Sequence, residues 1–411
     1  MLIAYKYRLY PDQAQKELLA QHFGCARHIY NWALEKKKLH YEHTGESLSR
    51  RQLQDLLVES KKEEKSWLRG VNSQSLLAAL QHLDTAFSNF FQGRAKFPRF
   101  KKKACGWQSF QCPQHVKVDF DSRRISLPKI PGIRAVLHRT FTGRVKTVTV
   151  KRTPSGKYYA SVLVDDGQQA PEPSAVQEQT TLGIDVGISH FAIDSNGDKT
   201  DNPRHLKRSL KKLAIEQRRL CRKKKGSANR ARQKRRVALV HEKISNRRND
   251  FIHQQTAKLV NNSHVASFAV ETLNIKGMVR NHKLACSITD CGWGHFIQAL
   301  KYKCERLGKN VLCIDRFAPS SKRCSSCGHI AAKIPLSVRT WMCPVCLSEW
   351  DRDVNAAINI KQYALADALG QSVCVKRSPA AKHVSACAAA KGAESFRHGS
   401  QEAPTRIVAT I

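Results

Sequence analysis

The chain has 411 residues, of which 71 are lysine or arginine and 33 are aspartate or glutamate, so its formal net charge is +38 at pH 7. A positive charge of this size attracts polyanions, and nucleic acid is the expected partner because each cation placed on a phosphate releases counterions. The sequence contains no apolar run long enough to cross a bilayer and no apolar signal-peptide core at its start. We therefore expect a cytoplasmic protein with no membrane partner.

The first 166 residues predict a β domain that is interrupted by helices. Residues 3–9 alternate like a short strand, and residues 10–99 carry apolar side chains at helical spacing. From residue 100 to residue 166 the period changes to two, and glycine and proline separate several short strands, which favours an antiparallel sheet or small barrel. We expect the strand at the amino terminus to join that barrel.

A linker rich in glutamine and proline, residues 167–179, leads into an α/β region at residues 180–318. "TTLGIDVGISHFAIDSNG" predicts a hairpin, "HVASFAVETLNI" and "NVLCIDRF" predict further strands, and "GHFIQALKYKCERLG" predicts an amphipathic helix. Another helix is expected in residues 350–363 of the same domain. From residue 364 the chain becomes rich in alanine without regular patterning, so a low-order tail is expected over 364–411.

Fourteen cysteines are present, and four of them have a regular spacing: Cys324, Cys327, Cys343 and Cys346. Two Cys-x-x-Cys pairs separated by fifteen residues fit a tetrahedral Zn²⁺ site, although four free thiols could fall on this spacing by chance. A site with four cysteine ligands has no open position for a substrate, so the predicted zinc ion is structural. Gly328 follows the first pair and favours its tight turn, whereas Leu347 follows the second.

Three acidic residues lie at the edges of predicted core elements: Asp185, Glu271 and Asp353. Each alone is most simply a solvated side chain. Together, an acid on a first strand, an acid at a later strand end and an acid at a helix start are typical of an RNase H-like nuclease core. Carboxylates that converge repel one another unless cations lie between them, and two Mg²⁺ ions meet that need in phosphodiester hydrolysis.

Asp351 and Asp353 compete for the role at the helix start. Asp351 can instead cap the helix N-terminus, and the small residues that follow Asp353 permit close packing on a sheet. We therefore assign the metal-ligand role to Asp353. The cysteine segment, residues 319–349, then forms a zinc ribbon inserted between the last core strand and the helix that carries this acid.

Residues 204–248 are densely basic and helix-compatible, with a break near "KKKGSAN". The alternatives are a solvated charged helix pair and a surface that grips a nucleic-acid backbone. We predict the second role for ten side chains: Lys211, Lys212, Arg218, Arg219, Arg222, Lys223, Lys224, Lys225, Arg235 and Arg236. Four aromatic residues are either core residues or stacking partners for bases: Trp67, Trp107, Tyr158 and Tyr159.

Over residues 1–363 the chain resembles the TnpB family, the RNA-guided nucleases of insertion sequences that are related to type V CRISPR effectors. The resemblance is carried in order by "YKYRLYPDQAQ", "GIDVG", "AVETLNIKGM", "SITDCGWGHF", "LKYKCERLG", "APSSKRCSSCG", "RTWMCPVC" and "DRDVNAAINI". The chain departs from the family at two positions, where Leu347 replaces the usual glycine and Trp350 replaces a frequent histidine.

This resemblance implies a RuvC-type nuclease in which Asp185, Glu271 and Asp353 bind Mg²⁺. It implies a wedge β-barrel, residues 1–9 and 100–166, interrupted by a helical recognition lobe at 10–99. It also implies a guide RNA from the right end of the element and a double-stranded DNA target beside a short adjacent motif. Base pairing would then supply sequence specificity, while the protein grips the backbone.

The sequence therefore favours an RNA-guided DNA endonuclease of a transposable element, associated with the nucleoid when bound to DNA. A guided DNA-binding repressor without cleavage and a transposase accessory protein are the alternatives. The intact set of three acids disfavours the repressor, and the absence of an obvious tyrosine nucleophile motif disfavours a transposase. The sequence does not predict an oligomeric state.

Overall fold

The computed structural model describes residues 1–370 except for residues 63, 104–107 and 336. The described residues belong to one compact unit. Most of the tail expected at 364–411 lies outside the described residues. No described helix is both long enough and apolar enough to cross a membrane.

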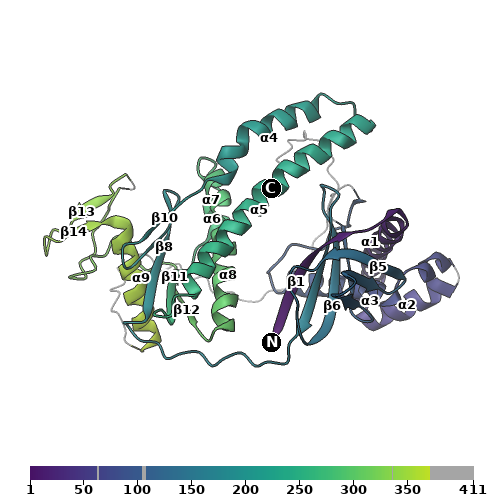
Figure 1. Ribbon diagram of the computed structural model, residues 1–411, viewed down its shortest axis with the longest axis horizontal. Coiled ribbons are helices and arrows are strands. Elements are labelled where there is room, and N and C mark those ends of the chain that lie inside the picture. The colour runs from purple at the N-terminus through teal and green to yellow at the C-terminus, as the bar shows by residue number, and fades with distance from the viewer. Residues whose placement is uncertain (63, 104–107, 336, 371–411) are drawn as a thin grey trace. The chain divides into compact units, whose positions relative to one another are not determined.

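The amino-terminal part is built on a seven-stranded antiparallel sheet (Figure 1). Its strands are β1 (Leu2–Tyr10), β2 (Gln108–Cys112), β3 (Lys117–Asp119), β4 (Arg124–Leu127), β5 (Ile130–Val136), β6 (Arg144–Arg152) and β7 (Tyr158–Asp165). The order is β2-β6-β7-β1-β5-β4-β3, so β1 pairs in the middle of strands that follow it by 100 residues or more. Among the described residues no pairing joins the edge strands β2 and β3, so the sheet is open where a closed barrel was expected.

Helices occupy the chain between β1 and β2, as the change of period predicts. They are α1 (Gln13–Thr44), α2 (Arg50–Lys62), the 3₁₀ helix η1 (Ser66–Gly70) and α3 (Ser73–Phe91). A capping box starts α1, since the Asp12 carboxylate accepts from the Gln15 N–H at 2.8 Å and the Gln15 side chain accepts from the Asp12 N–H. Gly45 ends α1 in the left-handed conformation. Apolar faces of these helices share one core with the sheet.

The second part is built on a five-stranded mixed sheet. Its strands are β8 (Thr181–Val186), β9 (His190–Asp194), β10 (Lys199–Asp201), β11 (Ser267–Glu271) and β12 (Asn310–Ile314). The order is β10-β9-β8-β11-β12, with β8, β9 and β10 antiparallel and β8, β11 and β12 parallel. This order and pairing confirm the hairpin and the strands expected from the sequence.

Helices cover both faces of this sheet. Figure 1 shows α8 (Trp293–Arg306) and α5 (Ala228–Val260) on one side and α9 (Arg352–Ala368) on the other. The apolar side chains of β8 and β11 that face α5 and α8 form the core of this part. Two short helices, α6 (Ile275–Met278) and α7 (Ala285–Cys291), follow β11, and a two-stranded ribbon of β13 (Thr340–Met342) and β14 (Glu349–Asp351) precedes α9.

The predicted break in the basic stretch is also present, since α4 (His205–Cys221) and α5 form a helical hairpin. The expected start of the tail at residue 364 is wrong. Helix α9 continues to Ala368, because Tyr363, Ala364 and Leu365 are buried and extend its packed face. The last turn consists of small apolar residues without an obvious period, so the sequence did not predict it.

Candidate functional site

Strand alternation places two of the predicted acids on the face of the sheet that α9 covers. Along β8, Leu182 and Ile184 face the core formed with α5 and α8, so Gly183 and Asp185 point to the opposite face. In β11 the same alternation turns Glu271 toward α9. Val270 pairs with Ile184 across the two parallel strands, so Glu271 and Asp185 follow at the next position of each strand.

The third acid, Asp353, lies in the first turn of α9 and completes the group. Burial raises the pKa of Asp185 well above its ordinary value, and the negative charges of Glu271 and Asp353 raise it further. The three predicted residues are therefore close enough to interact. Their mutual repulsion in a buried setting is relieved by a divalent cation, and oxygen donors of this kind suit Mg²⁺.

Each outer acid has a protein partner in this structure. Glu271 accepts a hydrogen bond from the Ser320 hydroxyl. Asp353 forms an ion pair with Arg339 at 3.2 Å, and a second nitrogen of that guanidinium donates to the Ser189 hydroxyl at 3.0 Å. Arg339 is a residue that the sequence did not single out, because one arginine among 71 basic residues carries no local signal.

Asp351 takes the capping role that was weighed for it. Its carboxylate accepts from the backbone N–H groups of Asp353 at 3.0 Å and Val354 at 3.2 Å. It also pairs with the Lys199 ammonium at 2.5 Å, and the pKa of Asp351 is lowered by these contacts against the effect of burial. A carboxylate with its lone pairs committed in this way is less available to a metal ion than its neighbour.

Close contact between β8 and α9 fixes the distance between the acids. A Cβ atom placed on Gly183 would lie 2.1 Å from the Ala357 carbonyl oxygen, so only glycine fits at this crossing. Ala356 and Ala357 are buried in the same contact, as their small size predicts. The helix that carries Asp353 therefore packs directly on the strand that carries Asp185.

Two buried asparagines of α9 hold the cysteine segment against the helix. Asn355 Nδ2 donates to the Arg323 carbonyl at 2.7 Å, and its Oδ1 accepts from the Ser325 N–H at 3.0 Å. Asn359 Nδ2 donates to the carbonyls of Ser320 at 2.8 Å and Arg323 at 2.6 Å. Their spacing of four residues places both on one face of the helix, and this spacing is a signal that the sequence carries.

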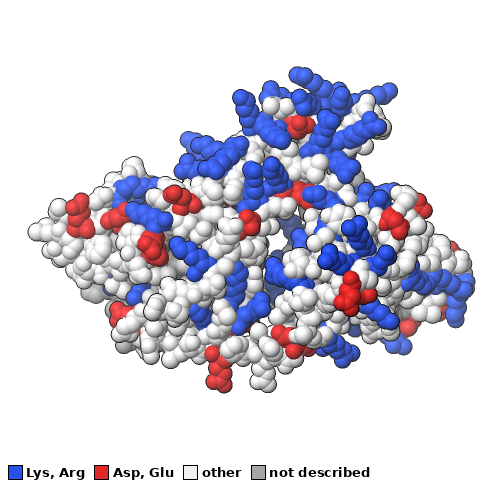
Figure 2. Space-filling view, viewed as in Figure 1, with Lys and Arg blue, Asp and Glu red and all other residues white. Residues whose placement is uncertain are grey.

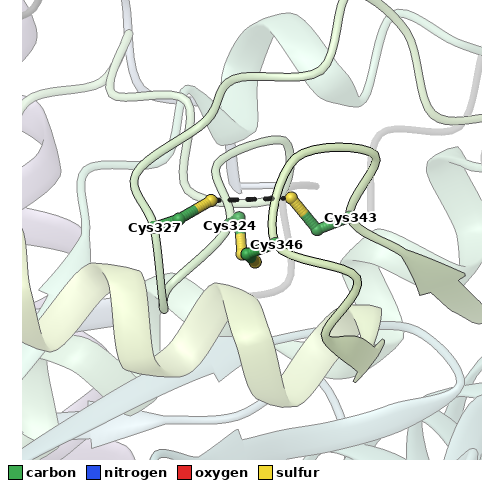
Figure 3. A group of neighbouring side chains, drawn as sticks. All are labelled: Cys324, Cys327, Cys343 and Cys346. Carbon is green, nitrogen blue, oxygen red and sulfur yellow. Dashed lines mark hydrogen bonds between the residues drawn. The ribbon is translucent and has the colours of Figure 1, made fainter.

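The four predicted cysteines converge (Figure 3). All four Sγ atoms lie within 4.8 Å of one another, and the Cys324–Cys346 and Cys327–Cys343 pairs are each 3.6 Å apart. Four thiolates around one Zn²⁺ ion at about 2.3 Å are separated by about 3.8 Å, so the geometry fits a tetrahedral zinc site. Among the described residues this is the one group of histidine, cysteine and acidic side chains whose ligand atoms lie this close together.

Both knuckles have the same backbone turn. Gly328 N–H donates to the Cys324 carbonyl and Leu347 N–H donates to the Cys343 carbonyl, each at 2.9 Å. Gly328 has a φ of 77° and Leu347 a φ of 59°, so leucine adopts the left-handed conformation that glycine favours. The hydrogen bond between the Cys346 sulfur and the Ser348 hydroxyl, together with the Ser348 N–H, lowers the pKa of Cys346 to about 6, which favours the thiolate that zinc binds.

The ten predicted nucleic-acid contacts all lie on the α4–α5 hairpin or in its connecting turn, and all are exposed. Figure 2 shows lysine and arginine gathered over this hairpin at the top of the view. Arg219 pairs with Glu216 at 3.1 Å, and Arg235 donates to the Ser155 carbonyl at 2.9 Å. A cavity of about 770 Å³ beside the hairpin is lined by further cations, among them Arg208, Lys243 and Arg247.

The aromatic candidates separate into different environments. Tyr158 is 7% exposed and belongs to the core, whereas Trp67 is 52% exposed. Tyr159 donates to the Glu242 carboxylate at 3.3 Å and lies under the cations of Lys6 and Arg8. Trp107 lies outside the described residues. Of the three that the structure describes, Trp67 has the exposed ring that stacking on a base requires.

Comparison with protein families assigns three segments. Residues 161–282 match the OrfB family of IS605 elements, described as "probable transposase", and residues 293–360 match the TNB domain of Cas12f1-like proteins. Residues 1–46 match a family described as a helix-turn-helix domain. In this structure that segment holds β1 and the single helix α1 of 32 residues, so it contains no helix-turn-helix.

Whole-chain relatives are similar over most of their length. A protein of Streptomyces pristinaespiralis, provisionally named an RNA-guided DNA endonuclease, is 38% identical over 90% of this chain and 90% of its own. InsQ of Escherichia coli K12, also provisionally named an RNA-guided DNA endonuclease, is 34% identical over 87% of this chain and 91% of its own. Among solved structures, a Cas12f1 complex with guide RNA and target DNA has a TM-score of 0.53 at 15% identity, covering 85% of this chain and 83% of that one. This last similarity concerns the fold.

Proposed function

The chain belongs to the OrfB, or TnpB, family of insertion-sequence proteins, and we propose that it is an RNA-guided DNA endonuclease with a RuvC-type nuclease centre. The observation that supports this function best is the convergence of Asp185, Glu271 and Asp353 on one face of an RNase H-like sheet. Relatives that carry the same provisional activity match nine tenths of the chain, which supports the same role here.

The three carboxylates would hold two Mg²⁺ ions. When bound, such ions lower the pKa of a water nucleophile and stabilise the leaving oxygen of a phosphodiester. Asp185 is the buried member of the group, and the negative charges of Glu271 and Asp353 both act on it. Ser320 orients Glu271, and Asp351 caps the helix, so Asp353 does not serve as the cap.

Arg339 is a cation that forms an ion pair with one acid of this centre. Its guanidinium now holds Asp353, and its planar fork of donors also suits the non-bridging oxygens of a phosphate. Once the charge of Asp353 is taken up by a metal ion, Arg339 can turn to the substrate. We assign it the role of holding the scissile phosphate beside the acids.

The zinc ribbon, residues 319–349, would act as a positioning device. Its structural zinc fixes the two knuckles, and the buried amides of Asn355 and Asn359 fasten the first knuckle to α9. The chain thereby returns from β12 to the start of α9 in one defined geometry. A rigid metal-bound insertion next to an acidic site is explained if the insertion sets the place of Asp353.

The nucleic-acid partners would be a guide RNA from the right end of the element and a double-stranded DNA target. The exposed cations of the α4–α5 hairpin suit the backbone of the guide or of its heteroduplex with DNA. The wedge sheet, residues 1–9 and 100–166, and the helical recognition lobe, 10–99, would read the short target-adjacent motif. Residues 167–179 would link them to the nuclease, residues 180–318 and 350–363, whose helix α9 continues to Ala368.

The test is to sequence the RNA that copurifies with the protein, exchange its guide segment and map the cut in matched DNA targets. A cut that moves with the guide supports the proposal. A cut that ignores the exchange excludes RNA guidance, and guided binding without any cut identifies a repressor. An Asp185→Ala protein that carries the same RNA serves as the control for contaminating nuclease.

A further inference from the structure

A cluster of phenylalanine rings is exposed where α3 ends. Phe87, Phe90 and Phe91 lie in the last turns of the helix, and Phe97 packs edge-on against Phe87 at 5.5 Å and against Phe90 at 5.3 Å. The outer rings remain in contact with solvent, since Phe91 is 75% exposed and Phe97 is 41% exposed. Phe100, three residues further on, is 46% exposed. We call Phe91, Phe97 and Phe100 the phenylalanine platform.

Backbone contacts fix the segment that presents these rings. Asn89 accepts at its carbonyl from the N–H groups of Arg94 at 2.9 Å and Ala95 at 3.0 Å, which closes the turn after the helix. Asn31 of α1 then forms two hydrogen bonds with the Lys101 backbone. Its Nδ2 donates to the Lys101 carbonyl at 3.0 Å, and its Oδ1 accepts from the Lys101 N–H at 2.7 Å. Pro98 between these points is buried. The platform is therefore a preformed surface whose exposure does not result from a loose loop.

Cations surround the platform. Residues 94–103 contain no acid and six basic residues: Arg94, Lys96, Arg99, Lys101, Lys102 and Lys103. The Lys38 ammonium lies 5.4 Å from the ring centre of Phe97 and 5.5 Å from that of Phe100. Apolar rings bordered by positive charge match a polyanion that also carries flat apolar faces, and single-stranded nucleic acid has both.

The phenylalanine rings of the platform can contact a nucleic-acid base only by stacking on its flat face. Its ring has no hydrogen-bonding group, so the platform rings cannot read the edge of a base or a ribose hydroxyl, whereas every base offers a flat face. Exposed apolar patches of this kind mark interaction sites. A surface of this chemistry is expected to bind unpaired bases without regard to their identity.

We propose that the phenylalanine platform stacks the unpaired bases of single-stranded DNA. This inference rests on the proposed function, because pairing of a guide RNA with one target strand leaves the other strand unpaired. The surrounding lysines and arginines then contact the phosphates of that strand. The platform would thereby hold the displaced strand and disfavour its return to the duplex.

The experiment measures binding without guide or cleavage. Full-length protein, freed of copurified RNA in high salt and kept in EDTA, is titrated with a labelled single-stranded DNA, the same sequence as a duplex, and the same sequence as RNA. Phe91→Ala/Phe100→Ala removes two platform rings and leaves the edge-on packing of Phe97 in place. Tyr302→Ala removes an aromatic ring that is 41% exposed on α8 and serves as the matched control.

The double alanine variant should weaken binding of single-stranded DNA by about tenfold or more, the combined effect of two lost stacking contacts. Duplex binding should change by no more than about twofold, and the Tyr302 control should bind like the wild type. Phe91→Trp/Phe100→Trp should retain the affinity, whereas Phe91→Leu/Phe100→Leu should lose it, because leucine keeps apolar area but has no flat ring face. The tryptophan and leucine pairs keep the test valid if the alanine variant folds poorly.

Four results would overturn the proposal. Full affinity in the leucine variant would indicate an apolar contact with another protein or a second copy of this chain. An equal loss for duplex and single strand would indicate a charge effect, and a larger loss for RNA than for DNA would assign the platform to RNA. If the double alanine variant binds single-stranded DNA normally and still makes guided cuts, the platform proposal is excluded and the endonuclease proposal stands.

If the wild-type protein stacks DNA on these rings but never cuts, the endonuclease proposal is excluded instead.

Discussion

At the scale of single residues, the nuclease proposal depends on three acids that act together. Asp185→Ala, Glu271→Ala and Asp353→Ala should each abolish DNA cleavage while RNA binding stays nearly intact, because loss of one ligand disables the shared metal centre. Cleavage of a guided target and retention of copurified RNA, measured on the same preparations, check this outcome.

Asp351→Ala is the matched control for these substitutions. It removes the cap of α9, which costs about 0.5–2 kcal/mol of stability, but it should keep appreciable cleavage. An inactive Asp351 variant beside an active Asp353 variant would reverse the two roles.

Leu347 gives a second test at this scale, because it adopts a left-handed conformation without packing to justify it. Its φ is 59° and it is 70% exposed. Glycine removes strain of roughly 1–2 kcal/mol and adds about 0.5–1 kcal/mol of unfolded-state entropy. Leu347→Gly should therefore stabilise the ribbon by about 0.5–1 kcal/mol.

The gain in ribbon stability is measured by following the release of zinc to a chelator as the denaturant concentration is raised. Leu347→Ala keeps the strained backbone and should show no gain. A ribbon that becomes weaker with glycine would mean that the leucine side chain contributes a contact outside the isolated chain.

The sequence predicted the roles of some of these residues and not of others. Cysteine spacing and the order of the acids can be read from short stretches of the sequence. The sequence therefore placed Cys324 in the four-cysteine cluster and Asp353 at the start of a helix, where the structure has them. Arg339 was not, because its role exists only after the ribbon folds back onto α9. The left-handed backbone at Leu347 was hidden for the opposite reason, since the residue type argues against the conformation that the zinc knuckle imposes.

At the scale of elements, the crossing of β8 and α9 sets the distance between Asp185 and Asp353. Gly183→Ala places a Cβ atom where the Ala357 carbonyl oxygen lies 2.1 Å away, so the helix must move. Overpacking of this kind costs about 1–3 kcal/mol, and a shift of about 1 Å at the acids lowers cleavage about a hundredfold. Thermal unfolding and cleavage rate together check both effects.

Gly24→Ala provides the comparison. Gly24 lies inside α1 with no atom within 4 Å of the added Cβ, so alanine should stabilise the protein by about 0.5–1 kcal/mol without loss of cleavage. Equal cleavage by both glycine variants would show that the crossing does not position the acids.

The zinc ribbon is the second element whose effect reaches the acids. Cys324→Ser removes a ligand of a metal whose binding contributes on the order of 10 kcal/mol to folding of small zinc modules. The first knuckle should then unfold and release Asn355 and Asn359, so cleavage should fall about a hundredfold while RNA remains bound. Zinc content, RNA retention and cleavage are measured on one preparation.

Cys286→Ser changes an exposed cysteine outside the cluster and should alter none of the three quantities. Full cleavage by a zinc-free Cys324 variant would show that the ribbon does not place Asp353.

Periodicity predicted the boundaries of elements whose apolar residues repeat regularly. It did not predict them where that repeat is missing. The hairpin β8–β9 and the split between α4 and α5 were predicted because glycine and turn residues mark them. The last turn of α9 was missed because Ala364 and Ala366 are buried but carry little hydrophobic signal. Closure of a barrel is a property of strand order, which no local pattern encodes, and β2 and β3 remain edges among the described residues.

At the scale of the whole molecule, the excess charge predicts that nucleic-acid binding depends strongly on salt. Lys223, Lys224 and Lys225 lie exposed between α4 and α5, and each phosphate that a cation neutralises contributes about 0.7 to 0.9 to the slope of log K against log salt concentration. Replacing all three with glutamine should therefore lower that slope by about 2 to 3 and weaken RNA binding most at low salt.

Replacing the same three lysines with arginine tests whether charge or shape is responsible. Arginine keeps the positive charge, so the arginine variant should keep the wild-type slope, although its affinity at one salt concentration can change through its different hydrogen bonding. The slopes are measured by titrating labelled guide RNA at several salt concentrations. If the glutamine variant keeps the slope of the wild type, the tip of the hairpin does not contact phosphates and the guide lies elsewhere on the protein. If both variants lose the slope, the lysine side chains act through their geometry, and net charge does not explain why this protein binds nucleic acid at the hairpin.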